Sequence, residues 1–144
     1  MIWHGGVKPD LAQLTALGEG TMPGFLGIEF TDVGDDWIEA RMPVEARVHQ
    51  PYGRLHGGAS VVLAETIGSV GAAMSVDRAT HGAVGLEINA NHVRPVRDGF
   101  VTARASCESR GRTTQIWTIR ITDDAGKLVC IARITMAIIA MDRA

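Results

Sequence analysis

The chain has 144 residues, a formal net charge of −2 and a sequence pI near 6.2. This length supports a real core, and we expect one domain over residues 1–144. The small net charge gives no reason to expect nucleic acid or an anionic membrane as a partner. Cys107 and Cys130 are the only cysteines, and the N-terminus lacks a basic-then-apolar signal pattern, so we expect a reduced, cytoplasmic protein.

The first half of the chain predicts a short helix and a β-hairpin. Leucines recur at three-residue steps behind Asp10, a good helix cap, and predict a helix over residues 11–20. Residues 23–33 and 37–44 flank a Gly-Asp-Asp turn and read as two paired strands. Residues 45–54 form a polar loop that leads into the next element.

Residues 57–76 predict the central element, a helix of about five turns. Glu65 is its single charged residue, and no polar face recurs at a helical period, so we expect the helix to be buried all round. The run approaches membrane-spanning length. Its glycines, serines and central glutamate favour a buried helix of a soluble protein instead.

The rest of the chain predicts strands joined by short turns. After a turn at 77–82, strands are expected over 83–96, 100–109, 113–122 and 128–140, and the intervening turns contain glycine. Short turns between consecutive strands require those strands to pair antiparallel. The result is an α+β fold in which a sheet of five to six strands wraps part of one long helix, and another subunit is needed to cover the remainder.

Glu65 is unusual because its helical neighbours offer no cation to pair with: they are Val61, Val62, Gly68 and Ser69. A carboxylate in such a place is costly unless it has a function or a partner. The simpler alternative is that Glu65 reaches solvent through a gap between packed elements.

The start of the same helix reads His56-Gly57-Gly58. Glycines permit close approach to the backbone, and the first N–H groups of a helix lack intrahelical partners. Such a start is suited to an anion or an oxyanion. Together with Glu65 it favours catalysis, although glycines at a helix start also serve packing.

The spacing of these groups has a geometric consequence. Gly57 and Glu65 are eight residues apart, or about 12 Å along one helix, too far for both to touch one carbonyl group. If both act on the same atom they must come from different chains. Two such helices lying antiparallel about a two-fold axis would meet this requirement, which predicts an obligate oligomer with interfacial sites.

Two strings carry a resemblance to a known family, QPYGRLHGGASVVLAETIGS at residues 50–69 and GLEINANHVR at 85–94. They resemble the hotdog-fold acyl-CoA thioesterases of the branch that uses a helix glutamate, and the similarity extends over nearly the whole chain. The resemblance implies a hotdog fold and hydrolysis of an acyl-CoA to a free acid and CoA, without a metal or redox cofactor. It also implies a cytoplasmic homo-oligomer, with dimeric interfacial sites and assembly to a tetramer.

Similarity within that branch favours an aryl acyl group, with 1,4-dihydroxy-2-naphthoyl as the candidate, and so a role in menaquinone synthesis. The residues leave two alternatives open. In a lyase-like hotdog enzyme, His56 and Glu65 would handle the α-proton and hydroxyl group of a hydroxyacyl thioester. A non-catalytic acyl-CoA-binding domain would not need Glu65 in an apolar helix.

For hydrolysis, Glu65 is expected either to act as general base on water or to attack the thioester as a nucleophile. The Gly57 N–H is the expected oxyanion donor. By similarity, Gln50 and His56 hold the thioester carbonyl and Ser69 positions the water or the acyl group, with Glu65 and Ser69 supplied by the other protomer. Each has a simpler alternative: solvation for Gln50, helix capping for His56 and a bond to its own backbone for Ser69.

Arginine suits the phosphates of CoA. By resemblance, CoA is held by Gly85 and by two segments, His92-Val93-Arg94-Pro95 and Ser109-Arg110-Gly111-Arg112-Thr113-Thr114. In the second segment the arginines depart from the family pattern. The simpler alternative for these arginines is a solvated strand edge that discourages aggregation.

Overall fold

Apolar side chains alternate with polar ones along the later strands, and this alternation gives the sheet one buried face. In β5, for example, Gln115, Trp117, Ile119 and Ile121 are buried while the residues between them are more exposed. The computed structural model describes residues 1–142. It contains one antiparallel sheet of six strands in the order β1-β2-β4-β5-β6-β3. The strands are β1 Glu29–Val33, β2 Trp37–Pro43, β3 His81–His92, β4 Phe100–Arg110, β5 Thr114–Thr122 and β6 Leu128–Ala140.

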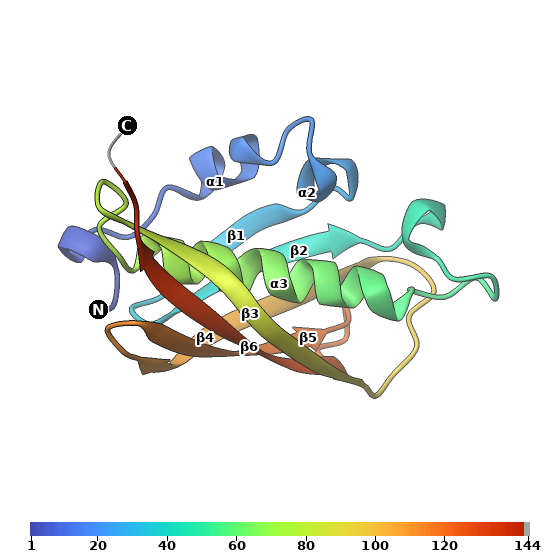
Figure 1. Cartoon of the computed structure of the whole chain (residues 1–144). Helices are drawn as coiled ribbons and strands as arrows, with labels where there is room; N and C mark the ends of the chain where they lie inside the picture. The colour runs from blue at the N-terminus through green and yellow to red at the C-terminus, as the bar shows by residue number, and fades with distance from the viewer. Residues whose placement is uncertain (143–144) are drawn as a thin grey trace.

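The sheet curves around the long helix α3, Gly57–Met74, as Figure 1 shows. Leu63, Ala64 and Ile67 point into the sheet and are fully buried. Each fully buried leucine or isoleucine contributes about 1.5–3 kcal/mol to stability. The helix is long and apolar enough to cross a membrane, but here it is the core helix of a folded domain. The predicted hotdog architecture is confirmed.

One expectation for α3 is not met within a single chain. The helix is not buried all round, because Glu65 is exposed and Val61, Val62, Thr66 and Val70 are only half-buried. The sheet covers one face of the helix and leaves the opposite face open. The helix also ends at Met74, two residues before the predicted end.

Two helix glycines set how closely α3 approaches the sheet. A Cβ atom at Gly68 would lie 2.8 Å from Ile134 Cγ2, and one at Gly71 would lie 2.9 Å from two ring carbons of Trp117. Both distances are shorter than real carbon contacts, so any side chain there would push the helix off the sheet. The glycines therefore fix the depth of the helix and, with it, the direction in which Glu65 points.

A buried hydrogen-bond network holds the C-terminal end of α3. The Ser75 carbonyl oxygen accepts from Arg110 Nη2 at 2.8 Å, and Ser75 Oγ accepts from Gln115 Nε2 at 2.8 Å. Gln115 Oε1 in turn accepts from Trp117 Nε1 at 2.9 Å. The network joins the helix end to β4 and β5, so the helix is positioned along its axis as well as in depth.

The helical part of the N-terminal region packs beside α3, outside the sheet (Figure 1). Helix α1, Leu11–Leu17, is capped by Asp10, whose carboxylate accepts from the Gln13 N–H, and it is shorter than predicted. The predicted strand at 23–33 is wrong over its first residues. They form the short helix α2, Met22–Phe25, because a proline suits a helix start, and β1 begins only at Glu29.

The remaining differences are small. The strand predicted over 83–96 is wrong at both ends, because β3 begins at His81 and ends at His92, which leaves residues 93–96 outside it. Two 3₁₀ turns, His4–Gly6 and Ala46–Val48, were not expected. Residues 143 and 144 of the predicted domain lie outside the described residues. Cys107 and Cys130 are both free thiols, and burial raises the pKa of each, which keeps them protonated and unreactive at neutral pH.

We expect Gly71→Ala to lower the free energy of unfolding by up to about 2 kcal/mol, because overpacking costs about 1–3 kcal/mol and alanine recovers only about 1 kcal/mol of helix propensity. Urea unfolding measures the change. In a Trp117→Phe background, which removes the contacted ring atoms, the same substitution should become neutral or stabilising. An equal cost in both backgrounds would show that the Trp117 contact does not set the helix depth.

Candidate active site

The N-terminus of α3 presents two hydrogen-bond donors. His56 is the N-cap residue, and its Nδ1 accepts from the Gly58 N–H at 2.8 Å. In a neutral imidazole this assigns the proton to Nε2, which is then free to donate. None of the hydrogen bonds within residues 1–142 uses the Gly57 N–H. The helix start therefore offers one backbone and one side-chain donor, strengthened by the helix dipole.

Gln50 supplies a third donor from the preceding loop. Its Oε1 accepts from the Tyr52 N–H at 2.6 Å, which leaves the amide nitrogen Nε2 to donate. The loop is closed by a bond from the Gln50 N–H to the Arg54 carbonyl at 2.7 Å. Gln50 and Gly57 both line a hollow of about 410 Å³ at this end of the helix.

His92, Val93, Arg94 and Pro95 line the same hollow. A Cβ atom at Gly57 would lie 2.8 Å from His92 Nε2, so the imidazole lies directly against the helix start. Only glycine permits this approach. The structure thus brings the first predicted CoA segment beside the predicted oxyanion donor, and Arg94 gives this hollow a guanidinium group.

Glu65 lies in a second hollow of about 400 Å³, whose lining is largely apolar. Its carboxylate rests against β3, because a Cβ atom at Gly85 would lie 3.1 Å from Glu65 Oε1. Ser69 lines the same hollow. Its hydroxyl donates to Met136 Sδ at 3.8 Å rather than to the helix backbone, a weak bond that leaves the oxygen able to interact with a ligand.

The apolar walls of this hollow were not foreseen from the sequence. They are Met22 and Pro23 from α2 and Val62, Thr66 and Val70 from α3. The three α3 residues recur at four-residue steps beside Glu65, a signal that was visible in the sequence. Met22 and Pro23 could not be assigned, because residues 23–33 were read as a strand.

The structure does not bring the two halves of the predicted site together in one chain. Gln50, His56 and Gly57 gather at the start of α3, whereas Glu65 lies about 12 Å and Ser69 about 18 Å further along the helix. The two hollows share no lining residue. A reacting group held by one half is therefore out of reach of the other half of the same chain.

The second predicted CoA segment lies at the opposite end of the molecule from the first. Ser109 and Arg110 end β4, Gly111 to Thr113 turn, and Thr114 begins β5. Arg110 is bonded to Ser75, just past the end of α3, so this turn lies about 27 Å from Gly57 along the helix. Within one chain, the segments cannot hold the same phosphate group.

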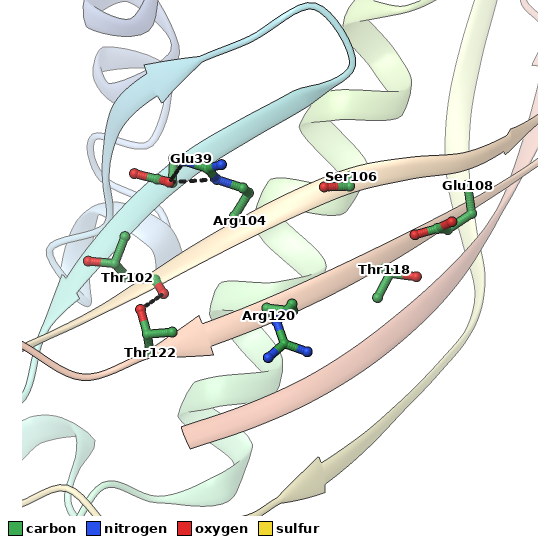
Figure 2. Close-up of a pocket in the computed structure, with 8 residues that line it drawn as sticks. All are labelled: Glu39, Thr102, Arg104, Ser106, Glu108, Thr118, Arg120 and Thr122. Carbon is green, nitrogen blue, oxygen red and sulfur yellow. Dashed lines mark hydrogen bonds and ion pairs between the residues drawn. The ribbon is translucent and has the colours of Figure 1, made fainter. Parts of the chain in front are cut away.

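A further hollow of about 420 Å³ lies on the outer face of the sheet, away from α3, and Figure 2 shows the side chains of β2, β4 and β5 that line it. Arg104 pairs with Glu39 at 2.7 Å and stacks on Trp37 at 3.8 Å. The other polar groups are threonines, Ser106, Arg120 and Glu108. Among residues 1–142 its lining comes from strands and includes no helix N-terminus, so this surface does not offer the backbone donors of a helix start to an oxyanion.

Known proteins resemble this chain both in sequence and in structure. Residues 52–130 match the model of the thioesterase superfamily. The 1,4-dihydroxy-2-naphthoyl-CoA hydrolase of Escherichia coli is 50% identical over 139 residues, which are 96% of this chain and 100% of that protein. The proofreading thioesterase EntH of Cronobacter turicensis is 44% identical over 138 residues, which are 96% and 98% of the two chains. The crystal structure of a mutant thioesterase from Pseudomonas aeruginosa superposes with a TM-score of 0.95 at 48% identity and covers 98% of this chain and 100% of that one.

The cap at His56 gives a prediction that does not depend on function. Replacing His56 by Ala should lower the free energy of unfolding by about 0.5–2 kcal/mol, because the Gly58 N–H loses its acceptor. His56→Asn should retain most of the stability, since asparagine is a strong N-cap residue. Urea unfolding of both variants tests this, and equal losses would show that the His56 bond does not cap the helix.

Proposed function

The chain belongs to the thioesterase superfamily and is a thioester hydrolase, and from this premise we propose that two copies build each active site, with Glu65 of one facing Gly57 of the partner subunit. The observation that carries the proposal is the division of the site within one chain. An exposed carboxylate in an apolar hollow and a set of unpaired donors lie on one helix, about 12 Å apart.

Strand β3 offers the surface for such a dimer. It stands at the edge of the sheet and pairs only with β6. Its outer side is apolar and open, since Val84 is 44% and Leu86 is 63% exposed. A long exposed edge of this kind is a template for pairing with another strand. Two β3 strands joined antiparallel about a two-fold axis would form one continuous sheet.

The same two-fold axis would lay two α3 helices side by side, antiparallel, along their sides nearest β3, and would leave the face of α3 toward α1 and α2 open. Gly57 of the partner subunit would then lie beside Glu65. The arrangement would also bring the turn at 109–114 of one chain toward His92 and Arg94 in the other. The two predicted CoA segments, separated in one chain, would then both be within reach of one CoA molecule.

In the proposed reaction Glu65 takes a proton from water while the water oxygen bonds to the thioester carbon. The carbonyl oxygen becomes negative and accepts from the Gly57 N–H of the partner subunit, with Gln50 and His56 of that subunit as further donors. The C–S bond then breaks, and the thiolate leaves as CoA and takes up a proton. Direct attack by Glu65, which forms a mixed anhydride that water then cleaves, gives the same products. Neither route requires a metal or redox cofactor.

We propose an aryl acyl group as the substrate. The hollow beside Glu65 is largely apolar, as an aromatic ring requires, and the E. coli relative is named as a hydrolase of 1,4-dihydroxy-2-naphthoyl-CoA. The similarity to thioesterases favours hydrolysis over the lyase and binding alternatives. The cytoplasmic location and the tetramer stay predictions.

Glu65→Gln should lower thiol release from aryl-CoA substrates by at least about a hundredfold, as loss of a general base usually does. The fold should stay intact, because Glu65 is exposed and has no ion-pair partner within residues 1–142. Thiol release under saturating substrate, with circular dichroism as the control, measures both effects. Retained activity would remove Glu65 from the reaction.

The two-chain site predicts rescue between inactive variants. Gly57→Pro removes the donor N–H at a helix position that accepts proline, whereas Gly57→Ala keeps the N–H and is the matched control for the added bulk near His92. Mixing Gly57→Pro with Glu65→Gln subunits should restore activity, because one site in each hybrid dimer has both groups. Demonstrated subunit exchange without rescue would show that each site lies within one chain.

A further inference from the structure

The hollow beside Glu65 does not end there. It shares Pro23, Thr66, Ser69 and Val70 with a second hollow of about 370 Å³. That hollow continues along the same face of α3 to Ala73 and Met74, with Leu14 and Leu17 of α1 on the opposite wall. The two hollows form one groove between α3 and the α1–α2 region.

The groove is apolar along its length and polar at its ends. Thr66, on the floor, bonds its hydroxyl to the Val62 carbonyl at 2.6 Å, so this group does not interrupt the apolar surface. Glu65 stands at one end. Arg78 stands at the other end, where the groove meets a hollow that also contains Lys8.

Among the described residues, 1–142, Arg78 is a cation without a partner. None of the ion pairs or hydrogen bonds found within residues 1–142 uses its guanidinium group, although it is exposed beside an apolar groove. Lys8, by contrast, pairs with Asp35 at 3.6 Å. An unpaired guanidinium at the end of an apolar channel suits an anionic group carried on an apolar body.

We propose that, as a second substrate class beside aryl acyl groups, this groove binds an elongated acyl group whose far end bears a carboxylate, which Arg78 receives. The span from Glu65 to Met74 is about 13 Å, the length of an extended acyl chain of about ten carbons. The thioester would lie at Glu65, and the CoA would leave the groove toward the partner subunit. This inference rests on the proposed function, because it requires the thioester to react at Glu65.

The length of the groove is tested with Ala73→Phe, which places a ring across its far half. Thiol release is compared for benzoyl-CoA, which is short, and decanoyl-CoA, which would reach beyond Ser69. The ratio of kcat/KM for decanoyl-CoA over benzoyl-CoA should fall at least tenfold, because a blocked apolar pocket discriminates by about 1–3 kcal/mol. Leu17→Trp fills the groove from the other wall, so the test does not depend on one variant folding.

The matched control is Ala12→Phe, on an exposed position of α1 that does not line the groove; its ratio should equal that of the wild type. An unchanged ratio in both Ala73→Phe and Leu17→Trp would overturn the groove. If the wild-type protein hydrolysed neither substrate, the proposed function itself would fail. That outcome differs from failure of the groove alone, in which the wild-type protein hydrolyses a substrate but the variants leave the ratio of kcat/KM unchanged.

The role of Arg78 is tested by comparing decanoyl-CoA with the CoA thioester of decanedioic acid, which has the same length and ends in a carboxylate. In the wild type kcat/KM should be higher for the carboxylate substrate. Arg78→Gln should lower the ratio of kcat/KM for the carboxylate substrate over decanoyl-CoA about fivefold. This is the effect of losing one partly exposed ion pair of about 1 kcal/mol. Arg120→Gln, on the outer face of the sheet, is the control for loss of a positive charge. Equal ratios in wild type and Arg78→Gln would overturn the assignment of Arg78.

Discussion

The contact of α3 with the concave face of the sheet determines the rest of the structure. Gly68 and Gly71 allow the helix to lie directly on Ile134 and Trp117, where any side chain would separate them. The bonds of Ser75 to Arg110 and Gln115 fix the position of the helix along its axis. The depth of α3 against the sheet, its rotation about its own axis and its position along that axis are then all set. A carboxylate on the outward face of this helix is consequently held by the packing of the opposite face, and Glu65 needs no bonded partner of its own to be positioned.

A straight helix keeps its residues at fixed separations. Donors at its first turn and a carboxylate two turns later cannot converge on one atom, however well each is placed. The fold resolves this by leaving one helix face and one sheet edge uncovered. In a monomer both would be liabilities, because exposed Val84 and Leu86 on an unpaired strand favour association. In a two-fold dimer the same features would supply the interface and complete the site, so stability and catalysis would depend on one contact.

The apolar groove follows from the same geometry. Helices α1 and α2 pack beside α3 without closing on it, so the residues of α3 that face neither the sheet nor the proposed two-fold axis line a channel from Glu65 toward Arg78. Relatives of comparable identity include a naphthoyl-CoA hydrolase and a proofreading thioesterase. In the proposed site the start of α3 and Glu65 supply the thioester chemistry, whereas the walls of the channel are where acyl preference is free to vary.

By itself the sequence determined the six antiparallel strands, the long helix and the position of Glu65 within it. These depend on local periodicity and on turns with glycine, which short segments encode directly. The sequence did not reveal helix α2, because Pro23 and Gly24 in an apolar run fit a turn, a strand end or a single helical turn equally well. The eight-residue spacing of Gly57 and Glu65 also indicated that the site is divided within one chain. Only the tertiary structure decided that Glu65 is exposed, since burial of one helix face depends on which strands curve over it. The same holds for Arg110, which bonds to Ser75, and for the groove, whose walls come from segments about fifty residues apart that local sequence patterns cannot connect.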